Sequence, residues 1–415
     1  MSSSKNIRDY SIITLTYWGF TLSDGALRML LLLHLHERGY SALTLASLFI
    51  LYEFFGIITN LISGWLSTKS GLKLTLGIGL SLQIIACGIF GFTDFSLSVG
   101  FITALQGLSG IAKDFTKMSS KSYIKMVVPD GDQSQLLKWV ALLTGSKNTL
   151  KGVGYFLGGL LLTTMGFQKA CAAMAVYLGI TLIMSMLALP NGQGKSRASV
   201  GLRSLIPTDK RLIYLSASRL FLFGSRDTWF VVGLPIFLST SLGWSFESIG
   251  GFLALWIIGY GIVQASAPSF LGYKSSQTKN RSFPASGRLL VRWKIILIVP
   301  LILIAVGLLS EMPTLIVLVV GLGAFGVVFA MNSAFHSFLV LNYAEKDSVA
   351  LSVGFYYMSN AAGRLVGTVL SGVLYQAFGG ELTGLIACIA GATLMAAISA
   401  TLCVPLIFAE QTEAM

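Results

Sequence analysis

Long apolar segments separated by short polar stretches recur along this 415-residue chain. Each segment is roughly 20 residues long, the length of α-helix that crosses the hydrocarbon core of a bilayer. The pattern therefore predicts an all-α membrane protein with about twelve transmembrane helices. They are expected near residues 9–35, 42–66, 74–92, 97–125, 140–165, 170–189, 212–238, 248–270, 295–309, 314–339, 349–378 and 382–408.

The composition agrees with a membrane protein and excludes an ordinary soluble domain. Hydrophobic residues make up 54% of the chain and charged residues only 11%, whereas about a quarter of a soluble domain is charged. The four cysteines all fall within apolar segments and show no CxxC or metal-like spacing. They are expected to be packing residues, and neither a metal nor a cofactor is expected. The first apolar segment has no cleavage site for a signal peptidase, so it is expected to be retained.

Positive charge follows the predicted topology. The formal net charge is +12, and lysines and arginines are concentrated in alternate loops. Because cytoplasmic loops are enriched in such residues, the basic loops and both termini are expected on the cytoplasmic side of the cell's inner membrane. Topology accounts for the basicity, so no nucleic-acid partner is expected. The residues concerned are Lys69, Lys73, Lys121, Lys125, Lys195, Arg197, Arg203, Lys210, Arg211, Lys274, Lys279, Arg281, Arg288 and Arg292.

The two halves of the chain resemble each other at a nearly constant offset. We expect one six-helix half at residues 1–189, a cytoplasmic linker at 190–211 and a second six-helix half at 212–415. Two similar halves are typical of transporters whose substrate binds between them near the midplane. The matched positions are Phe20 and Asp24 with Phe223 and Asp227, Gly39-Tyr40-Ser41 with Gly243-Trp244-Ser245, Phe49 and Gly56 with Phe252 and Gly259, and Ala141-Leu142, Gly145, Gly154 and Gly158 with Ala350-Leu351, Gly354, Gly363 and Gly367.

The segment from Gly145 to Gly159 is unusual because it places two lysines inside an apolar helix. Placing one lysine near the middle of a bilayer costs about 3 kcal/mol on insertion scales. At 3.6 residues per turn, Lys147 and Lys151 lie about 40° apart on one face. Glycines along the segment allow close approach of other helices. Two interpretations remain open: the lysines extend to the membrane surface, or they face a water-filled cavity and hold an anion.

Twelve ionisable residues are predicted within the membrane, eight cationic and four anionic. Each is expected to pair or to face water. Asp24 is expected to pair with Arg28 one helical turn away, and Asp114 with Lys117. About four cations then remain, which indicates either a multiply charged oxyanion as substrate or purely structural charges. The twelve are Asp24, Arg28, Glu53, Lys113, Asp114, Lys117, Lys147, Lys151, Arg219, Arg226, Asp227 and Arg364.

Some of these residues are candidates for a proton path. Glu53 has no obvious local cation, and burial of an unpaired carboxyl group favours its neutral, proton-carrying form. The alternative for Glu53 is a carboxylate paired across helices. Asp24 and Asp227 are further candidates, and Asp227 is expected to meet a cation of a facing helix.

The fourth predicted helix carries lysines at an exact four-residue step, at Lys113, Lys117, Lys121 and Lys125. Lys113 and Lys117 are deep enough to reach a cavity between the halves. Lys121 and Lys125 are expected at the solvated cytoplasmic end of the helix.

The turn between the second and third predicted helices, Gly64 to Lys73, resembles the loop signature of the major facilitator superfamily. That signature has an acidic residue where this chain has Thr68.

A more specific resemblance covers nearly the whole chain, in strings that include the buried charges. These strings are Tyr17-Trp18, Phe20-Thr21-Leu22, Asp24-Gly25-Ala26-Leu27-Arg28, Ser109-Gly110-Ile111-Ala112-Lys113-Asp114, Lys117-Met118-Ser119, Thr144 to Asn148, Lys151-Gly152-Val153-Gly154, Arg219 to Gly224, Arg226-Asp227, Gly250 to Trp256 and Gly259 to Gln264. In them the chain resembles the organoarsenical-efflux permeases known as ArsJ, a branch of the major facilitator superfamily. The resemblance implies export of 1-arseno-3-phosphoglycerate and arsenate resistance. It also implies a functional partnership with the glyceraldehyde-3-phosphate dehydrogenase that makes this adduct from arsenate.

We therefore expect a monomeric, alternating-access exporter of a small anion, with proton antiport as the superfamily's common energy source. An enzyme is not expected, because the three histidines form no catalytic constellation. A sensor is not expected either, because the sequence shows no soluble signalling domain. Another organophosphate or a sugar-acid anion is the alternative substrate. The expected substrate-binding residues are Arg28, Lys113, Lys117, Lys147, Asn148, Lys151, Arg226 and Arg364, and the candidates for proton coupling are Asp24, Glu53 and Asp227.

Overall fold

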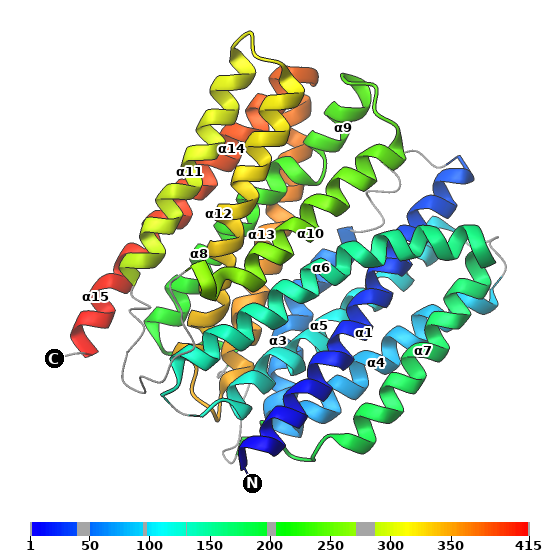
Figure 1. Ribbon diagram of the computed structural model, residues 1–415, viewed down its shortest axis with the longest axis vertical. Coiled ribbons are helices and arrows are strands. Elements are labelled where there is room, and N and C mark those ends of the chain that lie inside the picture. Colours follow the sequence, from blue (N-terminus) through cyan, green and yellow to red (C-terminus); the bar gives the residue numbers. More distant parts are fainter. Residues whose placement is uncertain are drawn as a thin grey trace.

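The computed structural model describes residues 2–39, 50–93, 98–129, 131–196, 205–270 and 287–413. Within these ranges the chain forms fourteen α-helices and no strand (Figure 1). The first half comprises α1 (Ser2–Glu37), α3 (Ile50–Ser70), α4 (Leu72–Phe92), α5 (Val99–Val127), α6 (Gln133–Met165) and α7 (Phe167–Ala188). The second half comprises α8 (Lys210–Phe230), α9 (Gly233–Thr240), α10 (Phe246–Phe270), α11 (Gly287–Leu309), α12 (Thr314–Tyr343), α13 (Val349–Ala377), α14 (Glu381–Thr401) and α15 (Val404–Glu413).

The twelve predicted spans are confirmed as helices in the described part of the chain. Short breaks separate α8 from α9 and α14 from α15, and each pair forms one span. The helix α11 begins at Gly287 rather than near residue 295, because its first turns carry Arg288, Arg292 and Lys294 and so escape an apolar pattern. The predicted start of the second helix, at 42–49, lies outside the described residues, as do the matched positions Tyr40, Ser41 and Phe49.

Seven spans in the described residues are long and apolar enough to cross a membrane by length and composition alone. The other five are α1, α3, α5, α6 and α13, and each carries ionisable residues within its length. The hydropathy of these five helices is lower because they carry charges, and such charges must be paired or hydrated inside the protein.

Glycines set the packing of α6 and α13, the two helices that share the matched glycines. A Cβ atom added to Gly154 would lie 2.7 Å from the Leu22 carbonyl oxygen of α1, and one on Gly363 would lie 2.0 Å from the Leu220 carbonyl oxygen of α8. The backbones therefore touch, as in other membrane helix pairs that pack on small residues. These two matched glycines therefore pack on the corresponding first helix of each half, α1 and α8.

The same two helices also contact the opposite half. On α6, a Cβ on Gly145 would lie 2.5 Å from the Gly261 carbonyl oxygen of α10. On α13, a Cβ on Gly354 would lie 2.7 Å from the Asn60 carbonyl oxygen of α3. Each of α6 and α13 thus packs closely on one helix of its own half and one helix of the other.

The loop between α3 and α4 is a tight turn at Gly71, whose φ of 95° is accessible to glycine at little steric cost. Beside it, the main-chain nitrogen of Ser196 donates to the Thr68 carbonyl oxygen at 2.8 Å. The Thr68 hydroxyl donates to the Gly64 carbonyl oxygen at 2.9 Å. Thr68, which replaces the acidic residue of the superfamily loop, is therefore buried and bonded within its own helix.

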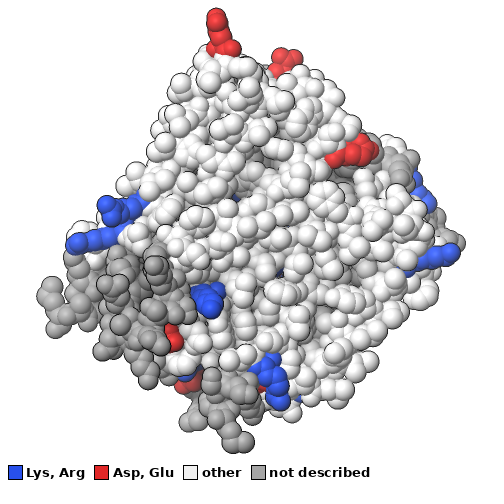
Figure 2. Space-filling view, viewed as in Figure 1, with Lys and Arg blue, Asp and Glu red and all other residues white. Residues whose placement is uncertain are grey.

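In Figure 1 α1 begins at the bottom of the molecule and α15 ends at its left, and we call this end of the bundle the basic end. From there the helices of the first half run towards the right of the view and those of the second half towards the top. At the opposite end of the second half, Figure 2 shows acidic side chains at the top of the molecule. Glu247, Glu311 and Glu381, which lie at or just before the starts of α10, α12 and α14, are exposed. Much of the surface between this acidic end and the basic end carries no charge, as expected for contact with lipid.

The two halves share one hydrophobic core at the basic end. There, Leu339 of α12 and Val353 of α13 belong to the same buried cluster as Ile124 of α5 and Val140 of α6. The separate cluster around Trp229 and Phe325, towards the other end of the second half, contains only second-half residues among those described. The structure is therefore closed between the halves at the basic end.

Candidate functional site

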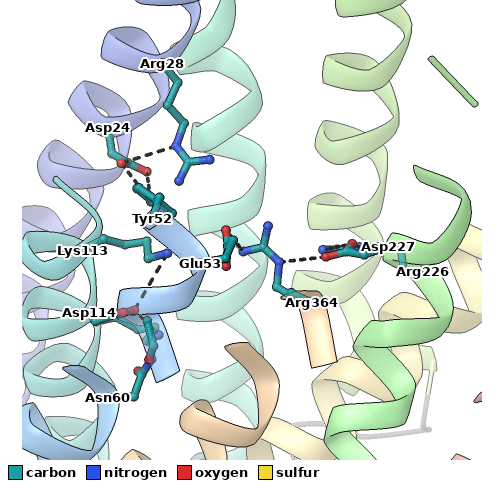
Figure 3. A network of polar contacts seen from close by, with 12 residues as sticks. Asp24, Arg28, Tyr52, Glu53, Asn60, Lys113, Asp114, Arg226, Asp227 and Arg364 are labelled. Carbon is teal, nitrogen blue, oxygen red and sulfur yellow. Dashed lines mark hydrogen bonds and ion pairs between the residues drawn. The ribbon is translucent and has the colours of Figure 1, made fainter. Parts of the chain in front are cut away.

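A chain of ion pairs crosses the middle of the bundle and joins the two halves (Figure 3). Arg364 of α13 lies between two carboxylates from different halves. Its Nη1 atom is 2.8 Å from Glu53 Oε1 on α3, and its Nε atom is 3.0 Å from Asp227 Oδ2 on α8. The expectation that Asp227 meets a cation of a facing helix is confirmed. Of the two interpretations of Glu53, the structure shows the carboxylate paired across helices, with a partner from a distant part of the sequence.

Asp227 holds a second arginine at the same level. Arg226 Nη2 lies 2.5 Å from Asp227 Oδ1, and Arg226 Nε also donates to this oxygen at 2.6 Å. The Asp227 side chain is fully buried, whereas the side chains of Arg226 and Arg364 remain 14% and 22% exposed. One buried carboxylate therefore orients two arginines that still present accessible cationic surface.

In the first half, Tyr52 of α3 separates two cations. The Arg28 guanidinium carbon and the Lys113 ammonium each lie 3.7 Å from the centre of the Tyr52 ring. Cations at this distance over an aromatic face are attracted by its quadrupole. The Tyr52 hydroxyl donates to Asp24 Oδ1 at 3.2 Å, and Arg28 Nε is 3.7 Å from the same oxygen. The predicted pair of Asp24 and Arg28 is confirmed.

Asp114 of α5 repeats this arrangement one level nearer the basic end. Lys117 Nζ donates to Asp114 Oδ1 at 2.6 Å, which confirms the predicted pair, and Lys113 Nζ is 3.9 Å from the same oxygen. The Thr59 hydroxyl donates to Asp114 Oδ2 at 2.9 Å. Asp114 is 1% exposed, so here too a buried carboxylate anchors lysines that keep some accessible surface.

Lys147 and Lys151 differ from all these cations. Both are partly exposed on α6, and within the described residues neither makes an ion pair with a carboxylate. Four other cations, Lys121, Lys117, Lys113 and Arg364, lie within electrostatic range of Lys147. Like charges in a partly desolvated space repel strongly, so this arrangement favours an anion among them.

Asn148, expected to orient the substrate, makes a contact between the halves. Its Nδ2 atom donates to Gln264 Oε1 of α10 at 2.6 Å, and Gln264 Nε2 donates to the Ser333 hydroxyl of α12 at 3.1 Å. In this structure its amide nitrogen is therefore occupied by protein.

Sequence reasoning missed two features beside these cations, the burial of Lys121 and the role of Tyr52. Lys121 was expected in solvent but is 5% exposed, with Nζ donating to the Thr144 hydroxyl at 3.1 Å and to the Tyr357 hydroxyl of the other half. Its four-residue step from Lys117 placed it on nearly the same helical face, which was the available signal. Tyr52 gave no such signal, because its role depends on cations from two other helices.

Comparison with known families decides the class of protein. The sequence profile of the Major Facilitator Superfamily matches residues 13–290. The chain belongs to the major facilitator superfamily. It is therefore a multi-pass membrane transporter and not an enzyme, and its twelve spans have the arrangement of that superfamily.

Solved transporters share the fold over nearly the whole chain. The human organic anion transporter MFSD10 (TETRAN) is 16% identical with a TM-score of 0.71, covering 95% of this chain and 99% of that one. The proton:xylose symporter XylE is 13% identical with a TM-score of 0.75, covering 98% and 97%. A bacterial homologue of the iron transporter ferroportin, in an outward-facing state, is 13% identical with a TM-score of 0.70, covering 96% and 98%. At such identities the likeness shows the fold alone. A search of curated proteins found no match.

Proposed function

We propose that this transporter exports a small organic anion with two oxyanion groups, and that its substrate is 1-arseno-3-phosphoglycerate. The observation that carries the proposal is the pair Lys147 and Lys151, which face the centre of the protein without a carboxylate partner among the described residues. Oxyanions such as phosphate and arsenate form strong charge-assisted hydrogen bonds with such groups. The resemblance to the ArsJ permeases selects the arsenical from among possible anions.

The cations divide into groups that suit a substrate charged at both ends. Lys147 and Lys151 on α6 would bind one oxyanion, together with Lys113, Lys117 and Arg28 of the first half. The other oxyanion would bind Arg226 and Arg364 of the second half, whose guanidinium groups suit bidentate contacts to such anions. A substrate held by both halves favours their joint movement, which is the basis of alternating access.

The proposed direction of transport, outwards, follows from where the proposed substrate is made, and the proposed orientation indicates which state releases it. The positive-inside rule places the basic end and both termini in the cytoplasm of a cell with the protein in its inner membrane. The structure closed at the basic end would then be the outward-facing, releasing state. The adduct would be supplied inside by a glyceraldehyde-3-phosphate dehydrogenase, and a single chain would suffice for transport.

Proton antiport would act through the carboxylates that hold the arginines. Glu53 and Asp227 both contact Arg364. Protonation of either carboxylate and binding of an anion both weaken the ion pairs of Arg364, so the two events are coupled at this residue. Asp24, linked to Tyr52 and Arg28, is the third candidate carrier.

The test is uptake into everted membrane vesicles, with the adduct generated in place from glyceraldehyde 3-phosphate, arsenate, NAD and the dehydrogenase. We expect arsenic to be trapped only when all components and the transporter are present, and a protonophore to reduce the trapping. Vesicles with the Lys147→Gln variant at equal membrane abundance are the control.

If well-inserted transporter traps no arsenic, the arsenical is not the substrate. The cations themselves do not distinguish arsenate from phosphate, so the alternative is another organophosphate or a sugar-acid anion. Labelled 3-phosphoglycerate in the same vesicles would then be the first compound to test.

A further inference from the structure

The closed basic end contains cations that the central site does not use. Arg219 of α8 is 2% exposed and Lys121 of α5 is 5% exposed. Counting along the helices at 1.5 Å per residue, they lie about 14 Å and about 9 Å from the ends of α8 and α5 at the basic end. Both are therefore deep within the layer where the halves meet.

Neither cation has a carboxylate partner among the described residues, although both are hydrogen bonded. Arg219 Nε donates to Asn360 Oδ1 at 2.8 Å and its Nη1 donates to the Ser333 hydroxyl at 3.2 Å. Lys121 donates only to the hydroxyls of Thr144 and Tyr357 in the described part of the chain. Neutral partners orient a buried cation but do not balance its charge.

The two cations come from opposite halves and lie within electrostatic range of each other. The aromatic rings of Tyr357 and Tyr356 lie beside them, at 4.7 Å from Lys121 Nζ and 5.0 Å from the Arg219 guanidinium carbon. Buried like charges repel, so the closed arrangement is electrostatically unfavourable without an anion. The gap lined by Lys121, Ser337 and Tyr357 is too narrow in this state to hold a water molecule.

We infer that Lys121 and Arg219 form a second anion subsite, which is accessible when the basic end opens and binds a phosphate-type oxyanion before it reaches the central site. Opening hydrates both cations and lets an oxyanion lie between them, with Asn360 and Ser333 as further polar neighbours. Lys117 connects the subsite to the central cations, because it lies 4.6 Å from the same Tyr357 ring that Lys121 contacts. The inference rests on the proposed anion transport but does not depend on the arsenical.

The experiment that tests this uses a thiol introduced by Ser337→Cys, beside Lys121, in everted vesicles that expose the basic end. The probes are an anionic sulfonate and a cationic ammonium methanethiosulfonate of similar size, each normalised to its rate with a free thiol. We expect the anionic reagent to react about tenfold faster, because a field from two nearby cations concentrates anions. 3-Phosphoglycerate should slow this reaction. The unsubstituted chain, whose four cysteines are buried, is the blank.

Charge-neutral variants locate the effect. Adding Lys121→Gln or Arg219→Gln should reduce the preference for the anionic reagent to about twofold or less, since each removes one of the two nearby charges. Lys138→Gln, at an exposed lysine near the same end of α6, should leave it unchanged. Any of three results would overturn the subsite. They are equal normalised rates for the two reagents, no labelling at all, or a preference for the anionic reagent that survives both neutral variants.

A transport measurement separates this inference from the proposed function. Lys121→Gln should raise the KM for the adduct presented at the basic end about tenfold, which is the effect expected for the loss of one charge-assisted contact. Lys121→Arg keeps the positive charge and should bring the KM most of the way back to that of the unsubstituted transporter. An unchanged KM in Lys121→Gln would count against the subsite. If the unsubstituted transporter traps no arsenic, the proposed substrate fails, while the labelling experiment still decides the subsite.

Discussion

Arg364 Nη1 and Glu53 Oε1, which come from different halves of the transporter, lie 2.8 Å apart. The same arginine contacts Asp227 in its own half, so its position depends on both halves at once. An anion that binds Arg364 must share it with these carboxylates. The pair is therefore a place where substrate binding can alter the contact between the halves.

We predict that Arg364→Gln and Glu53→Gln each destabilise the folded protein by about 2 to 4 kcal/mol, because each leaves a partly buried charge without its partner. The double variant should lose less than the sum of the two. Thermal unfolding of the purified proteins in detergent measures both effects. Strictly additive losses would show that the two side chains do not interact.

Lys147→Gln and Lys151→Gln should behave in the opposite way. Each removes a cation without a carboxylate partner in the described structure, so stability should be unchanged or rise by about 1 kcal/mol. Arsenic trapping in everted vesicles should nevertheless fall more than about tenfold, because a charge-assisted contact to the substrate is lost. Loss of stability together with transport would instead indicate structural lysines, and full transport would remove them from the site.

Tyr52 allows its ring and its hydroxyl to be tested separately. Tyr52→Phe keeps the aromatic face between Arg28 and Lys113 and loses only the hydrogen bond to Asp24, so we expect a loss of about 1 kcal/mol. Tyr52→Leu removes the face that attracts both cations and should cost about 2 kcal/mol more. Unfolding temperatures of the two variants provide the comparison, and equal losses would contradict a role for the ring.

Gly363→Ala is expected to prevent correct packing of α13 on α8. The added Cβ atom would lie 2.0 Å from a backbone oxygen of Leu220, which cannot move without shifting α8. The expected loss is about 3 kcal/mol or more, seen as a low yield of folded protein in the membrane. Gly259→Ala is the matched control, because nothing lies within 4 Å of its added Cβ. Normal yield of Gly363→Ala would show that the helices separate more easily than their contact suggests.

The sequence predicted well those features that depend on neighbouring residues. Apolar runs located the twelve spans, and spacing along one helix paired Asp24 with Arg28 and Asp114 with Lys117. The matched glycines indicated the repeated packing, because backbone contact between helices tolerates only small residues at fixed positions.

Features that depend on distant parts of the chain could not be predicted. The partner of Glu53 is on α13, far along the sequence, and no periodicity links the two residues. Lys121 follows the same helical step as Lys117, but its burial depends on Tyr357 from the other half. The closed state of the basic end likewise results from contacts between the halves. The pattern of apolar and polar residues along one helix cannot predict such contacts.

The glycine contacts of α6 and α13 have a mechanical consequence. Each helix touches the other half through backbone atoms, at Gly145 and Gly261 in one pair and at Gly64 and Gly354 in the other. Helices that meet at glycines present few side-chain obstacles at the point of contact. These two crossings are therefore the places where one half can tilt over the other with the least steric resistance.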